Sequence, residues 1–183
     1  MYADNSLTPR EAIRLCALGT LAYETSSVTE FLRYDDLVFA VRHFVSRITG
    51  PSLDLMGESI ELLRYEGLVE SDDAESANPS LKLTETGQAT LQTLLKANLR
   101  AGNSELNELI IALKFRFLHL LLHEDQRAQA DQFIDMCDTE LARLDDLLAH
   151  HDSEGGHLIE WLKHDIQRLE ARLSWLTVFR DKL

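Results

Sequence analysis

The chain has 183 residues, and 45% of them are hydrophobic, so it can bury a real core and is not a disordered tail. Its formal net charge is −13, and residues 1–100 hold nine Lys/Arg against fifteen Asp/Glu, so neither half is basic. This balance excludes strong nonspecific binding to nucleic acid, which depends on cations displacing counterions from phosphates, and any DNA contact must come from a local basic patch.

The composition also favours a mostly helical, cytoplasmic protein. Only three prolines and eight glycines occur, and long segments rich in Leu, Ala, Glu and Arg predict helices with little sheet. Cys16 and Cys137 are far apart and lie in apolar-periodic segments, which is typical of buried free thiols in a reducing compartment. The N-terminus lacks a signal-peptide pattern, and the longest apolar stretch, 109–122, is too short to span a bilayer. We therefore expect no membrane partner.

Three helices are predicted at the N-terminus. Thr8-Pro9-Arg10-Glu11 has the cap hydroxyl, the first-turn proline and the glutamate of a helix start, and that helix is interrupted at 25–27. A second helix follows from about Tyr34 or Asp35 to Ile48, with apolar residues at steps of three and four. A third runs from about Ser52 to Tyr65 and ends before Gly67, at its cap position.

Two short strands follow the third helix. Leu68-Val69-Glu70 and Leu81-Lys82-Leu83 flank a polar loop, 72–79, which suits the tip of a β-ribbon. Thr84 caps a further helix, about Glu85 to Leu99. A helix followed directly by a ribbon predicts a winged helix-turn-helix with a small two-stranded β-ribbon, in which the helix from Ser52 to Tyr65 can enter a DNA major groove.

The remainder predicts a second, helical part of the chain. Residues 101–104 are the best boundary, which gives a winged helix-turn-helix domain at 1–101 and a helical dimerisation domain at 102–183. Three helices are expected there, about 104–123, 127–150 and 157–182. Leucines at steps of three and four predict that the last two helices form an antiparallel hairpin. Apolar residues on the last helix predict a homodimer interface: Leu162, Ile166, Leu169, Leu173, Trp175, Leu176 and Phe179.

Three segments resemble the PadR family of bacterial transcription regulators. Residues 60–69 (IELLRYEGLV) are similar to the family's recognition-helix end and first wing strand, and 83–87 (LTETG) to the entry of the helix after the wing. Residues 169–176 (LEARLSWL) resemble the end of its helical dimerisation domain. The resemblance implies a homodimer held by C-terminal helices, two recognition helices on a pseudo-palindromic operator and, in some members, a small aromatic effector. The chain departs from the family pattern at 54–58 and in the long segment 25–35.

The candidate DNA contacts are cations and hydrogen-bonding side chains near the predicted recognition helix and wing. Phosphate contacts would position the domain, and a few side chains would read base edges. The candidates are Arg33, Arg42, His43, Arg47, Ser52, Ser59, Arg64, Asn78, Ser80 and Lys82. The acids of the same region oppose this interpretation: Asp54, Glu58, Glu61, Asp72, Asp73 and Glu75. The alternative is that these arginines form a solvated face paired to nearby acids.

Enzymatic and metal sites are not favoured. The chain has no Gly-x-Ser-x-Gly and no phosphate-cradling glycine loop, so we expect neither a catalytic site nor a cofactor. His119 and His123 lie four residues apart and could share a helix face, but the catalytic glutamate of the zinc-protease signature is missing. A structural role for these histidines is the preferred interpretation.

The leading functional hypothesis is a dimeric PadR-like transcription regulator that represses by operator occupancy. The aromatics Phe115, Phe117, Phe133, Trp161 and Trp175 could line an effector pocket, although such residues are more often core or dimer contacts. One alternative is a winged-helix interaction module whose acidic recognition face binds a protein partner. A ligand-binding dimer without DNA affinity is the third class considered.

Overall fold

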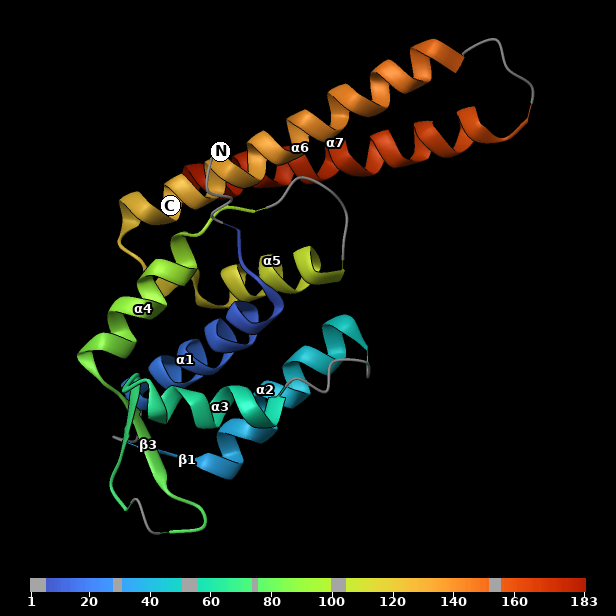
Figure 1. Cartoon of the computed structure of the whole chain (residues 1–183). Coiled ribbons are helices and arrows are strands. Elements are labelled where there is room, and N and C mark those ends of the chain that lie inside the picture. Colours follow the sequence, from blue (N-terminus) through green and yellow to red (C-terminus); the bar gives the residue numbers. More distant parts are fainter. Residues whose placement is uncertain (1–5, 28–30, 51–55, 74–75, 100–104, 152–155) are drawn as a thin grey trace, which may run out of the picture. The chain divides into compact units, whose positions relative to one another are not determined.

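The computed structural model of the chain describes residues 6–27, 31–50, 56–73, 76–99, 105–151 and 156–183, with backbone alone at 26, 27 and 56–59. It comprises two compact units, Met1–Leu121 and Leu122–Leu183. The first unit contains α1 (Pro9–Ser27), β1 (Leu32–Arg33), α2 (Tyr34–Thr49), α3 (Met56–Tyr65), β2 (Val69–Ser71), β3 (Ser80–Leu83), α4 (Glu85–Lys96), α5 (Glu105–Phe117) and a short 3₁₀ turn, η1 (Leu118–Leu120) (Figure 1). The second contains α6 (His123–His151) and α7 (Leu158–Lys182).

The first unit is a winged helix-turn-helix, as predicted. Helix α3 follows α2 in the chain, and the antiparallel pair β2 and β3 comes directly after α3. The start predicted for α3 at Ser52 lies outside the described residues. The helix after the wing ends at Lys96, before the predicted Leu99. Among the described residues, no helix has the length and apolarity needed to cross a membrane.

The sheet has a third strand that the sequence pattern did not predict. Strand β1 pairs antiparallel with β3, with Leu32 opposite Leu81, so the strand order is β1-β3-β2. On the other edge of β3, Val69 lies opposite Leu83 and Glu70 opposite Lys82. The prediction missed β1 because it has only two residues, which is too short for an alternating pattern to appear.

Helix α1 forms the centre of the first unit. It packs against α2, α3, α4, α5 and β3, and its side chains Ile13, Leu15, Leu18 and Leu21 are almost completely buried. Its N-terminus carries the predicted capping box. The backbone N–H of Thr8 donates to Glu11 Oε2 at 2.7 Å, and the N–H of Glu11 donates to Thr8 Oγ1 at 3.3 Å. These bonds satisfy amides that have no partner within the helix.

A compact joint connects the end of α3, the wing and the start of α4. Gly67 has φ +69°, which ends α3 in the left-handed conformation, and the N–H of Leu68 donates back to Leu63 O at 2.9 Å. Thr84 Oγ1 donates to Gly67 O at 2.7 Å and accepts the N–H of Gly87 at 3.0 Å. The N–H of Thr84 donates to Leu68 O at 3.2 Å. The two ends of the wing are therefore held together by the caps of the two helices beside it.

The second unit is an antiparallel helical hairpin, as predicted. Leu144 on α6 packs with Leu162 and Ile166 on α7, and Leu169 packs at the edge of this cluster. Arg180 Nε donates to Asp131 Oδ1 at 2.9 Å and so joins the end of α7 to the first half of α6. Helix α6 begins at His123 and not at the predicted Arg127.

The packing divides the chain later than the predicted boundary at 101/102. Helix α5 packs against α1 and α2. Along the chain, the boundary between the two compact units lies between Leu121 and Leu122. The apolar pattern predicted one helix over 104–123, whereas α5 ends at Phe117 and η1 follows it. The helical part that separates from the winged domain is thus a two-helix hairpin instead of a three-helix arm.

Lys114 is a buried cation inside the first unit. Its side chain has no exposed surface, and its Nζ donates to the carbonyl oxygens of Leu95 and Ala97, each at 2.6 Å. These carbonyls lie at the C-terminus of α4, where a cation satisfies orphan acceptors and complements the helix dipole. Burial nevertheless lowers the pKa of Lys114 to about 8.

Replacing Gly87 with alanine should strongly destabilise the winged domain. A β-carbon at this position would lie 2.0 Å from the Leu68 carbonyl oxygen, which is backbone and cannot move without opening the joint. We expect Gly87→Ala to lower the free energy of unfolding by about 3 kcal/mol, measured by urea denaturation. Gln88→Ala, at an exposed position of the same helical turn, is the control and should change it by less than about 0.5 kcal/mol. Equal midpoints for the two variants would contradict the close approach at Gly87.

The free energy of unfolding should depend on the protonation of Lys114. Because its folded pKa of about 8 lies below the ordinary value of 10.5, the unfolded chain binds more protons in that window, and stability should rise with pH. Between about pH 7.5 and about pH 9 the gain should be roughly 1 kcal/mol. Lys114→Met should lack this gain.

The effect of Lys114 is the difference in the free energy of unfolding between wild type and Lys114→Met at each pH. Burial raises the pKa of Cys16 to about 12, so its ionisation opposes the lysine effect above about pH 9 in both proteins. Parallel stability curves for the two proteins would show that Lys114 stays charged in the folded state.

Candidate nucleic-acid interface

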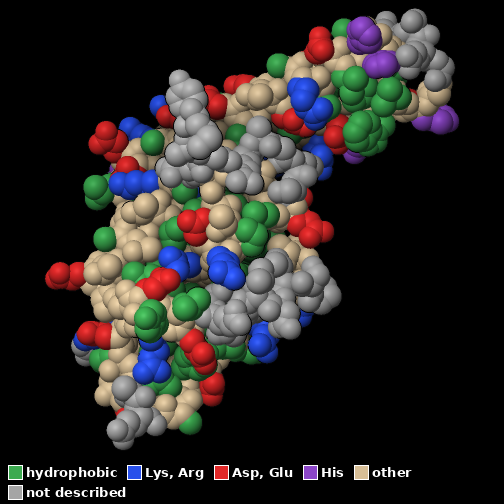
Figure 2. All heavy atoms as spheres, viewed as in Figure 1, with side chains coloured by type: hydrophobic (Ala, Val, Ile, Leu, Met, Phe, Trp, Pro, Cys, Tyr) green, Lys and Arg blue, Asp and Glu red, His purple; other side chains and the backbone are tan. Residues whose placement is uncertain are grey.

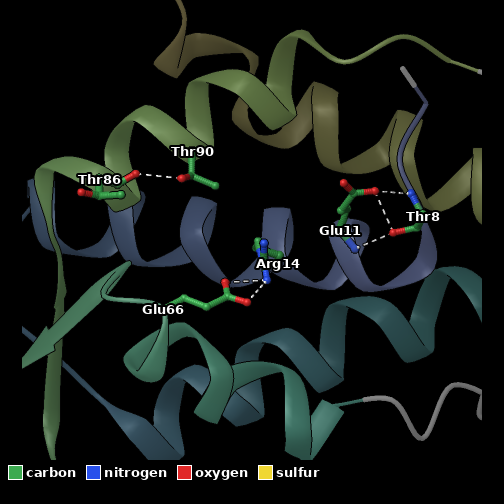
Figure 3. Close-up of polar contacts among 6 residues, drawn as sticks. All are labelled: Thr8, Glu11, Arg14, Glu66, Thr86 and Thr90. Carbon is green, nitrogen blue, oxygen red and sulfur yellow. Dashed lines mark hydrogen bonds and ion pairs between the residues drawn. The ribbon is translucent and has the colours of Figure 1, made fainter. Parts of the chain in front are cut away.

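Helix α3 is the predicted recognition helix, and its far end is anchored to α1. Ile60 and Leu63 are buried, which leaves Glu61, Arg64 and Tyr65 exposed. Just after α3, Glu66 Oε1 and Oε2 accept from Arg14 Nη2 at 2.8 and 2.6 Å (Figure 3). Because both partners are partly exposed, this ion pair contributes little to stability, but it fixes where the end of α3 lies against α1.

The N-terminus of α2 is capped by the wing. The N–H of Tyr34 donates to Pro79 O at 2.9 Å, and the N–H of Asp35 donates to Asn78 Oδ1 at 3.0 Å. Asn78 was predicted as a DNA contact, and its amide oxygen instead serves as the cap of α2. Ser80 belongs to the same loop, and its N–H donates to Asp72 Oδ1 at 3.0 Å. These bonds fix the position of the wing relative to α2.

Lys82 is held by an acid and an aromatic ring of its own domain. Its Nζ lies 3.1 Å from Glu70 Oε1 on the paired strand and 4.9 Å from the centroid of the Phe31 ring. Asp72 and Asp73, at the start of the wing loop, are exposed. The described wing therefore presents an ion pair and two further acids where a phosphate contact was predicted.

The outer face of α2, unlike the wing, carries exposed cations without an ion pair among the described residues. Arg42, His43 and Arg47 are all exposed, and neither arginine forms an ion pair within the described residues. Phe39, which is 70% exposed, stacks on the His43 ring at a centroid distance of 5.9 Å and an interplanar angle of 20°. Phe39 was not predicted as a contact, because the expected contacts with DNA are charged and hydrogen-bonding side chains, whereas this ring is a large exposed apolar group. We call these four residues the α2 face.

The charges of the first unit are mixed. Among the described side chains of the face drawn in Figure 2, Lys and Arg alternate with Asp and Glu. Arg33 and Arg64 are exposed, and Glu61 is exposed close to Arg64 on α3. Two predicted contacts, Ser52 and Ser59, have side chains outside the described part of the chain. The same holds for three of the acids that oppose DNA binding: Asp54, Glu58 and Glu75. The assignment of individual DNA contacts stays a prediction.

The predicted dimer residues fall into two groups. Leu162 and Ile166 lie in the core of the hairpin, Leu169 packs beside them, and Leu176 is also buried, so these four stabilise the monomer. An apolar seam between two helices looks the same within a chain as between chains, and here it packs α6 against α7. The dimer contact of these residues stays a prediction.

A second group remains on the surface of α7. Trp175 is 53% exposed and stacks on Phe179 at 5.3 Å, and Trp161 is 55% exposed. Val178 is exposed as well, whereas Leu173 is half-buried. Trp161 and Trp175 are two heptads apart and share one helix side.

The histidine pair considered for metal binding does not share a helix. His119 lies in η1 and its ring packs edge-on against Tyr23, with centroids 5.7 Å apart, whereas His123 starts α6 in the other unit. Within the described ranges, no group of three or more His, Cys, Asp or Glu side chains could hold a metal ion.

Comparison with known families agrees with this architecture. The family described as "Putative AphA-like transcriptional regulator" matches residues 2–180. The chain belongs to the AphA-like transcriptional regulators. Members of this family are regulators and not enzymes, so the prediction of a transcription regulator is confirmed. No curated protein matches the chain.

Solved structures similar to this AphA-like chain include three of Bacillus subtilis PadR. The complex with p-coumaric acid is 13% identical, with a TM-score of 0.37, and covers 96% of this chain and 97% of that one. The structure of PadR without a named ligand is 14% identical, with a TM-score of 0.39 and 96% coverage of both chains. The complex with operator DNA is 15% identical, with a TM-score of 0.36, and covers 93% of this chain and 98% of that one.

Proposed function

We propose that this AphA-like chain is a homodimeric transcription regulator that binds duplex DNA with α3 and the α2 face and represses by occupying its operator. The proposal is based on the position of α3, which is fixed in the domain on one side and exposes its other side to solvent. Helix α3 is anchored by the Arg14–Glu66 pair and the joint at Gly67, and it presents Arg64, which has no ion pair among the described residues. Such a regulator acts on the chromosome, in the cytoplasm.

The net charge of −13 restricts how such a protein can bind DNA. A protein with this excess of acids is repelled by phosphates, so a stable complex needs a few cations at the contact and base contacts that only a matching sequence satisfies. Affinity for random DNA should therefore be weak, and the ratio of specific to nonspecific affinity should be high.

The dimer in this proposal forms through the exposed aromatic side of α7. Trp161, Trp175 and Val178 are each more than half exposed, and large apolar side chains in that position are a feature of protein contacts. A second copy of the chain is the simplest partner, since one two-fold axis would bury the same side chains of both copies. It would also supply two α3 helices for a two-fold operator.

The proposal extends to a small aromatic effector, the class of ligand named in the structure of PadR with p-coumaric acid. An effector changes operator affinity only if it binds one dimer geometry more tightly than another. In that case the separation of the two α3 helices would change, and with it the fit to the two half-sites.

The wing supports a second candidate function. Glu70, Asp72 and Asp73 give it an acidic surface that suits a basic protein better than DNA. A winged-helix interaction module with a protein partner is therefore the alternative to a DNA-binding regulator.

Selection from a random duplex pool with the full-length chain tests the DNA-binding proposal. We expect a pseudo-palindromic sequence to be enriched and its gel-retarded complex to collapse as salt rises, because counterion release drives a phosphate contact. Arg64→Gln should weaken the complex with the selected duplex. Failure to enrich any sequence, together with capture of a basic protein by the same chain, would favour the interaction module.

Charge placed on the outer side of α7 should dissociate the dimer. We expect Trp175→Glu to shift the sedimentation coefficient from dimer to monomer while the helical content stays constant, because the ring lies on the surface of the hairpin. Thr177→Glu, at a neighbouring exposed position, is the charge-matched control. Two dimeric variants, or a wild type that sediments as a monomer, would refute the α7 interface.

A further inference from the structure

The α2 face combines two arginines, a histidine and an exposed phenylalanine on one side of a helix. Arg42, His43 and Arg47 follow Phe39 by three, four and eight residues, so all four lie on the exposed half of α2. Arg42 and Arg47 are about 140° apart around the helix axis and lie on either side of Phe39 and His43. The opposite side of the helix is buried through Leu37, Val41, Val45 and Thr49. The α2 face therefore has no role in the core of the domain.

The arginines of the α2 face, like Arg33 and Arg64, are exposed and have no ion pair among the described residues, whereas two other cations of the same unit are paired. Lys82 is committed to Glu70 and Phe31, and Arg14 is committed to Glu66. Arg42 and Arg47 have no carboxylate partner in the described structure, although the chain carries an excess of acids. Cations kept away from carboxylates on an acidic protein are available to an external polyanion.

The start of α2 cannot serve as the phosphate site. A helix N-terminus usually offers free amides to an anion, but here the N–H groups of Tyr34 and Asp35 are occupied by Pro79 O and Asn78 Oδ1. Asp35 and Asp36 add two carboxylates to the first turn. Any phosphate contact of α2 must therefore lie further along the helix, where the α2 face is.

The wing is unsuited to the same task. It offers Lys82 already neutralised at 3.1 Å by Glu70, and the exposed Asp72 and Asp73 would approach the phosphates with it. Each of these acids repels a phosphate within a Debye length.

We propose that this chain grips the DNA backbone with the α2 face and not with the wing. This inference rests on the proposed function and states how that DNA is held. Arg42 and Arg47 neutralise phosphates of one strand, in keeping with the first helix of a helix-turn-helix crossing the backbone. Phe39, held by its stack on His43, packs against the apolar edge of the deoxyribose, which gives the exposed ring a partner. The wing holds α2 in place through the bonds of Asn78 and Pro79 to its N-terminus.

Two double variants separate the α2 face from the wing. Arg42→Gln/Arg47→Gln removes both arginines, and Glu70→Gln/Lys82→Gln removes the wing pair without changing the net charge. Arg127→Gln, at an exposed position on α6, controls for the removal of a positive charge elsewhere. Affinity for the fluorescein-labelled duplex obtained by selection is measured by anisotropy across a salt series, after thermal melts confirm that each variant is folded.

The α2 variant should bind about tenfold or more weakly, and the slope of log affinity against log salt should become shallower by about two, one for each phosphate that an arginine no longer neutralises. Phe39→Ala should weaken binding without changing the slope, because it removes an apolar side chain and no charge. The wing variant should bind within about twofold of wild type with an unchanged slope.

The reverse pattern, with weaker binding and a shallower slope in the wing variant, would overturn the inference and leave DNA binding intact. Unchanged affinity in both double variants would also overturn it and would leave the α2 face to an acidic protein surface. If no duplex is enriched by selection, the proposed function itself fails, and the inference fails with it.

Discussion

The contact of Gly87 with the Leu68 carbonyl is the constraint on which the winged domain depends. At this point α3 has just ended through the left-handed Gly67, and α4 begins with the Thr84 cap. The Thr84 hydroxyl satisfies the carbonyl that follows α3 and an amide in the first turn of α4, so neither is left unpaired where the helices meet. A side chain at Gly87 would separate these elements. The direction of α3 and the positions of the two ends of the wing are thus set by one small group of backbone contacts.

The polar groups of the wing form contacts within the winged domain itself. Asn78 and Pro79 use their oxygens to cap α2, and Lys82 pairs with Glu70 across the strands. The residues that the sequence offered as wing contacts are therefore engaged within the domain, while cations without an ion-pair partner in the described structure remain on α2 and at Arg64. Electrostatic attraction is confined to a small area, which favours selectivity over affinity.

The sequence predicted the parts of the fold that local chemistry determines. The capping box at Thr8 and Glu11, the Gly67 helix end, the Thr84 cap and the hairpin of α6 and α7 each follow from residues close together in the chain. Strand β1 was missed because it is defined only by its pairing with β3. The assignment of α5 failed because its partners, α1 and α2, are distant in sequence. The roles of Asn78, Lys82 and Leu162 could not be predicted, since a polar or apolar side chain does not reveal whether it contacts its own chain or another molecule.

Hydrogen–deuterium exchange of the full-length chain, with and without the selected duplex, shows whether α2 and α3 are the elements that contact DNA. If the helix-turn-helix binds DNA, backbone amides of α2 and α3 should exchange more slowly in the complex. Amides of the wing loop, around residues 76–78, and of the tip of the α6–α7 hairpin should exchange as in the free protein. Protection confined to the hairpin, or an α3 that exchanges equally fast with and without DNA, would contradict the account.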